Sequence, residues 1–238
     1  GYANTTGSNS TAVGYEAARS TTTGGSNTML GRRAGYTLTT ANFNTIIGEQ
    51  AGYFNSTGSN NTFVGHYAGG ETLGASNTFI GLNSGYRVST GTKNTILGAY
   101  TGNNGGLDIR TASNYVVLSD GDGNLRQVFD SNGYALFGKT ASTLSTTGVE
   151  IGSSVATGGT YFYVTRSGAT AAYINRLTND GTLVAFHQAG TEEGSISVSG
   201  TTVSYNGGHL SRWSQLADNT RDESILKGTV MTNLDQMA

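Results

Sequence analysis

An acidic cluster between two predicted strands has residue types that suit cation binding. Asp120, Asp122 and Asn124 have the spacing of the first ligands of an EF-hand calcium loop. Such a loop also needs glycine at its sixth place and a bidentate glutamate at its twelfth, and those places hold Leu125 and Ser131. Aspartate followed by glycine is a strong hairpin signal, so we interpret the cluster as a turn and predict no metal site there.

Hydrolytic chemistry has little support in the sequence. A glycosidase needs two carboxylates held a few ångströms apart on rigid elements. Glu192 and Glu193 fall in a predicted turn, and Glu16 and Glu49 are not followed by acids in the next repeats. The three histidines are isolated and lack metal-ligand spacing: His66, His187 and His209. We therefore assign no catalytic residue, no metal ligand and no cofactor, and we expect a protein that is not an enzyme.

Three tyrosines have a spacing suited to ligand binding. Tyr36, Tyr53 and Tyr86 recur at the same phase of a repeat, so we predict that they form a ladder along one corner of the fold. Exposed aromatic faces stack on sugar rings, which makes these residues candidates for receptor binding. The alternative interpretation is that they pack between neighbouring repeats.

The element that positions these residues is a repeat of about 17 residues. The sequence motif Asn-Thr-apolar-apolar-Gly occurs six times, once with serine in place of asparagine. Its threonine stands at positions 11, 28, 45, 62, 78 and 95, so the copies lie 17, 17, 17, 16 and 17 residues apart. Threonine and the closing glycine occur in every copy and asparagine in five. A second half-repeat follows four of the copies: Ala34-Gly35-Tyr36, Ala51-Gly52-Tyr53, Ala68-Gly69-Gly70 and Ser84-Gly85-Tyr86.

This pattern predicts a solenoid of stacked β coils. One short strand with two glycine corners cannot bury its own apolar face, so each coil must pack against the next. The corner glycines permit backbone turns that other residues avoid. Asparagines stacked at one phase would hydrogen-bond from coil to coil, which satisfies their buried amides.

The two adjacent apolar positions indicate self-association. Because neighbouring strand residues point to opposite faces, we place the second, always aliphatic residue inside the coil and the first outside. The first positions are Ala12, Met29, Ile46, Phe63, Phe79 and Ile96. Since so apolar an outward stripe needs a cover, we predict a homotrimer with Met29, Ile46, Phe63, Phe79 and Ile96 at its interface. The alternative is a monomeric solenoid that buries both faces within one chain.

Composition supports an all-β fold and excludes several classes of protein. The chain has 37 glycines, no proline, no cysteine and 12% charged residues. Collagen needs proline and a Gly-X-Y period, and a cysteine-stapled secreted fold needs disulfides. A net charge of −2 without a basic stripe argues against nucleic acid as a partner. Because the longest apolar runs are far shorter than a bilayer-spanning helix requires, we also predict no membrane insertion.

The repeat ends after Gly102, and we predict three regions. Residues 1–103 form the solenoid shaft, 104–206 a distal domain of short strands and hairpins, and 207–238 a junction and helical neck. Asn132-Gly133 is a strong hairpin signal in the second region. Such short strands need partners from other chains to form a stable core. In the neck, Val230, Leu234 and Met237 recur at helical spacing and are predicted to join the trimer interface.

These residues resemble a known group of proteins. The Asn-Thr-x-x-Gly…Ala-Gly phrase, over about residues 1–103, resembles the repeats of phage tail fibres and neck appendages and, more distantly, the heads of trimeric autotransporter adhesins. The stretches 179–186, 194–198 and 204–206 also resemble phage fibres, in which they lead to a C-terminal intramolecular chaperone that is often removed by self-cleavage. Residues 209–216 are similar to the junction of a second chaperone class. Ser211 lies there without a lysine that could activate it.

The resemblance implies a trimeric virion fibre that attaches to the host cell surface. Its partners would be two further copies of the chain, other phage tail proteins, and a host polysaccharide or outer-membrane component. Its location would be extracellular, on the tail of the virion. The alternatives are a bacterial trimeric surface adhesin and a tailspike that depolymerises polysaccharide.

Overall fold

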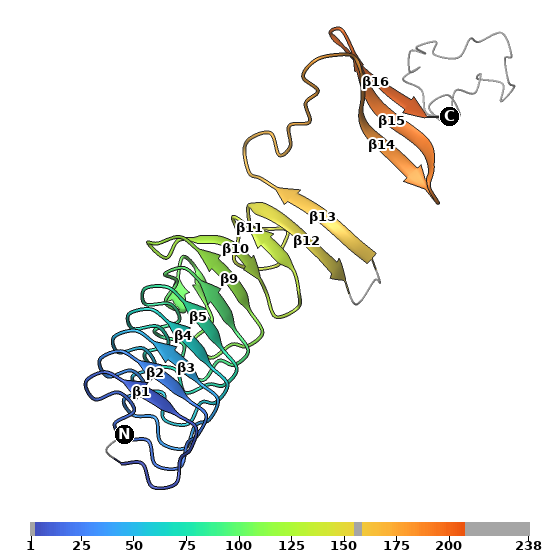
Figure 1. The fold of residues 1–238 in the computed structure, drawn as a ribbon. Coiled ribbons are helices and arrows are strands. Elements are labelled where there is room, and N and C mark those ends of the chain that lie inside the picture. Colours follow the sequence, from blue (N-terminus) through green and yellow to red (C-terminus); the bar gives the residue numbers. More distant parts are fainter. Residues whose placement is uncertain (1–2, 155–158, 208–238) are drawn as a thin grey trace, which may run out of the picture. The chain divides into compact units, whose positions relative to one another are not determined.

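The computed structural model describes residues 3–154 and 159–207 (Figure 1). The described residues form 16 β-strands and no helix, so the predicted all-β class is confirmed for them. Contacts divide the chain into two units, Gly1–Ala171 and Ala172–Ala238. The predicted neck residues Val230, Leu234 and Met237 lie outside the described residues.

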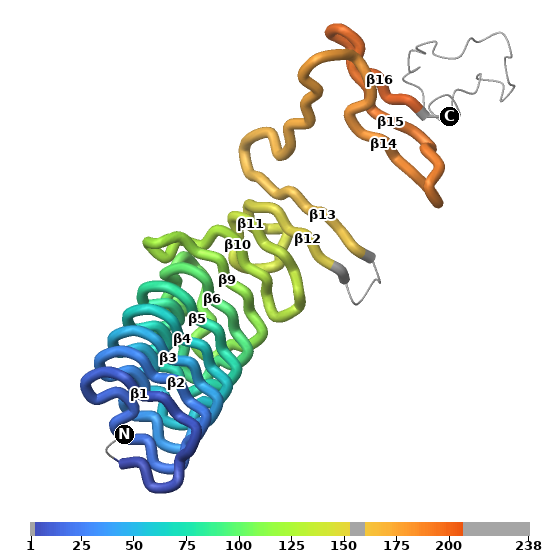
Figure 2. The backbone as a smooth tube through the Cα atoms, viewed as in Figure 1, coloured from blue at the N-terminus to red at the C-terminus, as the bar shows by residue number. Residues whose placement is uncertain are grey.

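The predicted solenoid is confirmed. Its six strands, each three residues long, pair in parallel with one strand per coil (Figures 1 and 2). They are β1 (Thr11–Val13), β2 (Thr28–Leu30), β3 (Thr45–Ile47), β4 (Thr62–Val64), β5 (Thr78–Ile80) and β6 (Thr95–Leu97). Each threonine pairs with the threonine of the next coil, so the repeat in the sequence becomes the register of the sheet.

Glycine ends each strand for a steric reason. Gly48 has a φ of +132°, a conformation that side chains disfavour. A Cβ at Gly48 would lie 2.3 Å from the carbonyl oxygen of Gly65 in the next coil. The corner therefore requires glycine both for its backbone dihedral and for the close stacking of the coils.

The predicted asparagine ladder is also confirmed. The backbone N–H of Asn61 donates to Oδ1 of Asn44 at 2.9 Å, and the N–H of Asn77 donates to Oδ1 of Asn61 at 2.8 Å. The Asn61 Nδ2 donates to the carbonyl of Gly74 at 3.0 Å. These side chains are buried. The ladder therefore pairs polar groups that would otherwise be unsatisfied inside the solenoid.

The predicted orientation of the apolar pair is wrong. Met29, Ile46, Phe63, Phe79 and Ile96 are fully buried inside their own coils, and the second residues point outward. The interior accepts large side chains because the opposite corner is small: a Cβ at Gly69 would lie 2.7 Å from the ring of Phe63. Because these five first-position residues are enclosed within one chain, they are no longer candidates for a subunit interface.

The sheet continues past residue 103, where a domain boundary was predicted. β9 (Val116–Ser119) pairs in parallel with β6, and antiparallel strands follow: β10 (Leu125–Phe129), β11 (Ala135–Phe137), β12 (Gly148–Ser154) and β13 (Gly159–Thr165). A small hairpin of β7 (Asn103–Asn104) and β8 (Leu107–Asp108) lies between β6 and β9 in the sequence. The result is one 11-stranded sheet with a continuous core row that adds Val117, Val128 and Leu136.

The second unit contains an antiparallel three-stranded sheet. Its strands are β14 (Gly181–Gln188), β15 (Thr191–Ser199) and β16 (Thr202–Gly207), in that order across the sheet. Among residues 172–206 the one buried side chain is Ser195. Within its described residues, this unit therefore has no apolar core of its own.

Candidate functional site

The tyrosine corner is the candidate site that the sequence indicated. The rings of Tyr36 and Tyr53 stack with their centroids 4.9 Å apart and their planes 1° from parallel. The guanidinium carbons of Arg19 and Arg33 lie 5.4 and 5.6 Å from the centroid of the Tyr36 ring. Tyr36 therefore contacts one aromatic ring and two cations within its own chain.

Glu16 organises the two arginines of this corner. Its Oε1 accepts a hydrogen bond from Arg19 Nη1 at 2.9 Å, and its Oε2 accepts one from Arg33 Nε at 2.8 Å. The hydrogen bond from Arg33 to Glu16 raises the pKa of Arg33. A separate exposed pair, Arg32 and Glu49, joins neighbouring coils at 2.6 Å, and its hydrogen bond lowers the pKa of Glu49.

Tyr86 belongs to a different aromatic group, so the predicted continuous ladder does not form. In the coil between Tyr53 and Tyr86, Gly70 occupies the position of the tyrosine. A Cβ at Gly70 would lie 2.6 Å from the Tyr86 ring. Tyr86 meets Tyr67 edge to face at 5.7 Å, and Tyr67 meets His66 at 4.3 Å. Burial raises the pKa of Tyr86. The alternative interpretation, packing between coils, describes both groups.

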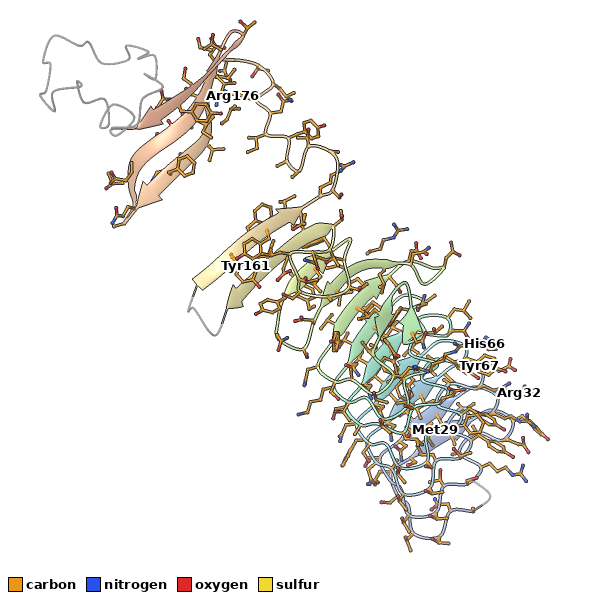
Figure 3. All side chains as sticks on the ribbon, turned by 180° about the vertical axis from the view of Figure 1, so that it is seen from behind. Met29, Arg32, His66, Tyr67, Tyr161 and Arg176 are labelled. Atoms are coloured by element: carbon orange, nitrogen blue, oxygen red, sulfur yellow. The ribbon has the colours of Figure 1, made fainter. Side chains whose placement is uncertain are left out.

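The corner still presents polar groups to solvent. Figure 3 shows Arg32, His66 and Tyr67 along the outer edge of the solenoid, whereas Met29 lies within the coil. Guanidinium, imidazole and phenol groups donate hydrogen bonds, and their ring edges offer apolar contact. This combination suits a polyhydroxylated ligand such as a surface glycan, and receptor binding by Tyr36, Tyr53 and Tyr86 stays a prediction.

The acidic cluster forms the hairpin turn that the sequence predicted. The Asp120 carboxylate accepts hydrogen bonds from the backbone N–H groups of Asp122 and Asn124 at 3.0 and 2.9 Å, and it pairs with Arg126. Hydrogen bonds from Asn124 lower the pKa of Asp120 to about 2. Its oxygens are thus engaged within the turn that joins β9 to β10.

The other carboxylates considered from the sequence do not assemble a hydrolytic site. Glu192 and Glu193 are exposed near the start of β15, rather than in the turn itself. Glu16 and Glu49 are each paired with arginine. Among the described residues, no group of three or more histidine, cysteine, aspartate or glutamate side chains could hold a metal ion.

A buried ion pair was missed by the sequence analysis. Lys139 Nζ lies 2.8 Å from Glu150 Oε2, and both side chains are almost fully buried. Tyr161 Oη donates to Glu150 Oε1 at 2.8 Å, and Ser142 donates to the same oxygen. Burial alone would raise the pKa of Glu150, but the hydrogen bonds from Lys139, Ser142 and Tyr161 outweigh it, so the pKa is lowered.

The position of this pair explains its role. Glu150 on β12 pairs in register with the core residue Leu136, so it ends the row of apolar side chains inside the sheet. Both carboxylate oxygens of Glu150 have partners. The cluster is therefore a polar closure of the core, not a free reactive group. Its members are separated in the sequence, so no local motif revealed them.

A cavity of about 480 Å³ lies beside β10 and the loop that leads to β12. Its polar lining includes Asn104, Arg126, Thr140 and Thr146. No carboxylate or histidine lines it. The cavity therefore lacks the paired acid and base that hydrolysis of a polysaccharide requires.

Comparison with known proteins gives no family for this chain. No protein-family model, no curated protein and no solved structure matches it. In the part of the chain that the structure describes, no helix has the length and apolar character to cross a membrane.

Proposed function

We propose that this chain is a structural segment of a homotrimeric virion fibre that attaches to a host cell surface. The observation that carries the proposal is the second unit, whose three-stranded sheet lacks an apolar core within residues 172–206. Phe186, Val203 and Tyr205 are 54%, 52% and 68% exposed on that sheet. A three-stranded sheet needs a buried apolar face to be stable, and further copies of the chain would supply it.

The solenoid supports a mechanical role. Its coils are joined by parallel backbone pairing, by the asparagine ladder and by glycine corners that allow close stacking. Such a repeat array is stabilised along its length by each neighbouring interface. A rod of this kind can hold a binding surface away from the virion, and the exposed corner residues around Tyr36 and Tyr53 would face the receptor.

The first experiment measures assembly. Light scattering after gel filtration should give three times 24.6 kDa, and the species should resist SDS before boiling. A monomeric mass in solution, with a band of monomer size in SDS before boiling, contradicts the proposal. Coexpression with any coding sequence that follows residue 238 in the gene provides the control for chaperone-dependent assembly.

The second experiment measures attachment. Fluorescently labelled trimer should bind a subset of a panel of bacterial strains, and soluble polysaccharide from a bound strain should compete. New reducing ends in that polysaccharide would identify a depolymerising tailspike instead. A membrane-anchoring β-barrel encoded after residue 238 would identify a bacterial surface adhesin.

A further inference from the structure

The outward side of the 11-stranded sheet carries two columns of side chains that follow the strand register, and we call them the outer face. The first column contains Thr11, Thr28, Thr45, Thr62, Thr78, Thr95, Val116, Phe129, Ala135, Ile151 and Phe162. The second contains Val13, Leu30, Ile47, Val64, Ile80, Leu97, Leu118, Gln127, Phe137, Val149 and Val164. The register of the strands makes both columns continuous from β1 to β13.

The outer face is uncharged along its whole length. Of its 22 positions, 15 hold apolar residues, six hold threonine and one holds glutamine. Several of its large side chains are open to solvent in the single chain: Leu30 is 46% exposed, Ile80 41% and Phe162 64%. Charged side chains border it: Arg32 and Glu49 lie just beyond the glycine corner, Lys93 lies two residues before Thr95, and Arg126 precedes Gln127 on β10. An apolar centre with a polar rim is the usual anatomy of a protein interface.

The size of the outer face matches a subunit contact. Eleven strands at a spacing of about 4.8 Å make it about 48 Å long, and two columns make it about 10 Å wide, which gives roughly 500 Å². That is at the upper end of the apolar patches found on monomers. It also supplies more than half of the area of about 800 Å² that each partner buries in a standard interface.

The threonine hydroxyls of the outer face are available for a partner. In the part of the chain that the structure describes, none of the six donates or accepts a side-chain hydrogen bond, whereas Thr22, Thr37 and Thr39 at other phases do. Their solvent-accessible column lies beside the aliphatic column. A partner surface with the same rung spacing could pair with these hydroxyls one coil at a time.

We propose that the outer face is the lengthwise contact between copies of this chain, packed parallel and in register around a common axis. This inference rests on the proposed homo-oligomer. It moves the subunit contact to the opposite side of the strands from the residues first expected there: Met29, Ile46, Phe63, Phe79 and Ile96. A second copy fits because it presents an equally long, uncharged surface with an identical rung spacing. A parallel arrangement places each aliphatic rung opposite its equivalent.

Because the chain contains no cysteine, single substitutions can test this contact without background. Ile47→Cys and Leu97→Cys should form covalent dimers with a short bismaleimide in the assembled protein, at a yield unchanged by tenfold dilution. Thr40→Cys and Thr57→Cys, at exposed positions outside the outer face, serve as matched controls and should stay uncross-linked. Ile47→Cys should also react at least tenfold more slowly than Thr57→Cys with a polar maleimide.

A second pair of variants separates the outer face from the rest of the assembly. Ile47→Lys with Val64→Lys should keep the circular dichroism of the solenoid, because both side chains point outward, but should lose SDS resistance or trimeric mass. Thr40→Lys with Thr57→Lys should retain both. If the wild type is trimeric while the Ile47→Cys variant reacts as fast as its control and the lysine variant stays SDS-resistant, the outer face is not the contact and the fibre proposal stands. A monomeric wild type overturns both proposals.

Discussion

Replacing Phe63 with alanine tests the interior of the solenoid most directly. The Phe63 side chain is fully buried, and its ring stacks on Phe79 with centroids 5.3 Å apart and planes 14° from parallel. A buried Phe→Ala change costs about 3–5 kcal/mol, since it removes apolar contact and leaves a cavity. Losing the aromatic pair adds about 1 kcal/mol. We expect Phe63→Ala to lower the free energy of unfolding by about 4–6 kcal/mol.

The adjacent residue provides the matched control. Val64 lies on the same strand but points outward and is half-buried in the single chain. Val64→Ala should cost about 1 kcal/mol or less in the unassembled chain, because little apolar area returns to water. Urea unfolding followed by circular dichroism would measure both variants. In the assembled protein the Val64→Ala effect should grow with subunit contact, whereas the Phe63→Ala effect should not depend on protein concentration.

The reverse order of the two effects would contradict the orientation of the strands. Suppose that, in the unassembled chain, Phe63→Ala lowers the free energy of unfolding by less than about 1.5 kcal/mol and Val64→Ala lowers it by more than Phe63→Ala does. The first apolar position then does not face the interior. The outer face, which depends on the same orientation, would then be wrong as well.

Three further changes probe the corners, the ladder and the core closure. Gly48→Ala should lower the free energy of unfolding by about 1–3 kcal/mol through backbone strain, measured as a fall in melting temperature. Gly121→Ala should be nearly neutral, because the space around its Cβ position is open. Asn61→Ala should cost about 2 kcal/mol in urea unfolding because it leaves buried backbone groups unpaired. Lys139→Met should cost about 3–5 kcal/mol at neutral pH by stranding the buried Glu150 carboxylate. Because folding lowers the pKa of Glu150 from 4.5, the stability that this carboxylate contributes is present above pH 4.5 and is lost as the pH falls below it. Calorimetry from pH 7 to 3 should therefore show the stabilities of the wild type and Lys139→Met converge at low pH.

The coils, the corners and the ladder could be predicted because the same sequence motif recurs. Regular spacing implied one strand per coil, and the invariant glycine implied the corner, since only glycine readily tolerates the φ of +132° found at Gly48. The asparagine ladder followed from the same regularity, because identical side chains at one phase must stack. The turn at Asp120 was also local, since its hydrogen bonds reach no further than Arg126.

The sequence also held a signal for the orientation of the strands. In Thr62-Phe63-Val64 the threonine and the valine share one face, because side chains alternate along a strand. A polar residue in every copy marks the solvent side, so the middle residue faces inward. The small Ala-Gly pairs of the second half-repeat, such as Gly69, leave the space that Phe63 fills.

The repeat, the corners and the ladder could all be derived from the amino-acid sequence, because each depends on residues one coil apart at most. Two features became visible only once the chain was folded: that the sheet runs past residue 103, and that Lys139 and Glu150 meet. Both depend on which separate segments of the chain pack together after folding. The strength of such contacts depends on a three-dimensional fit that local sequence patterns do not encode.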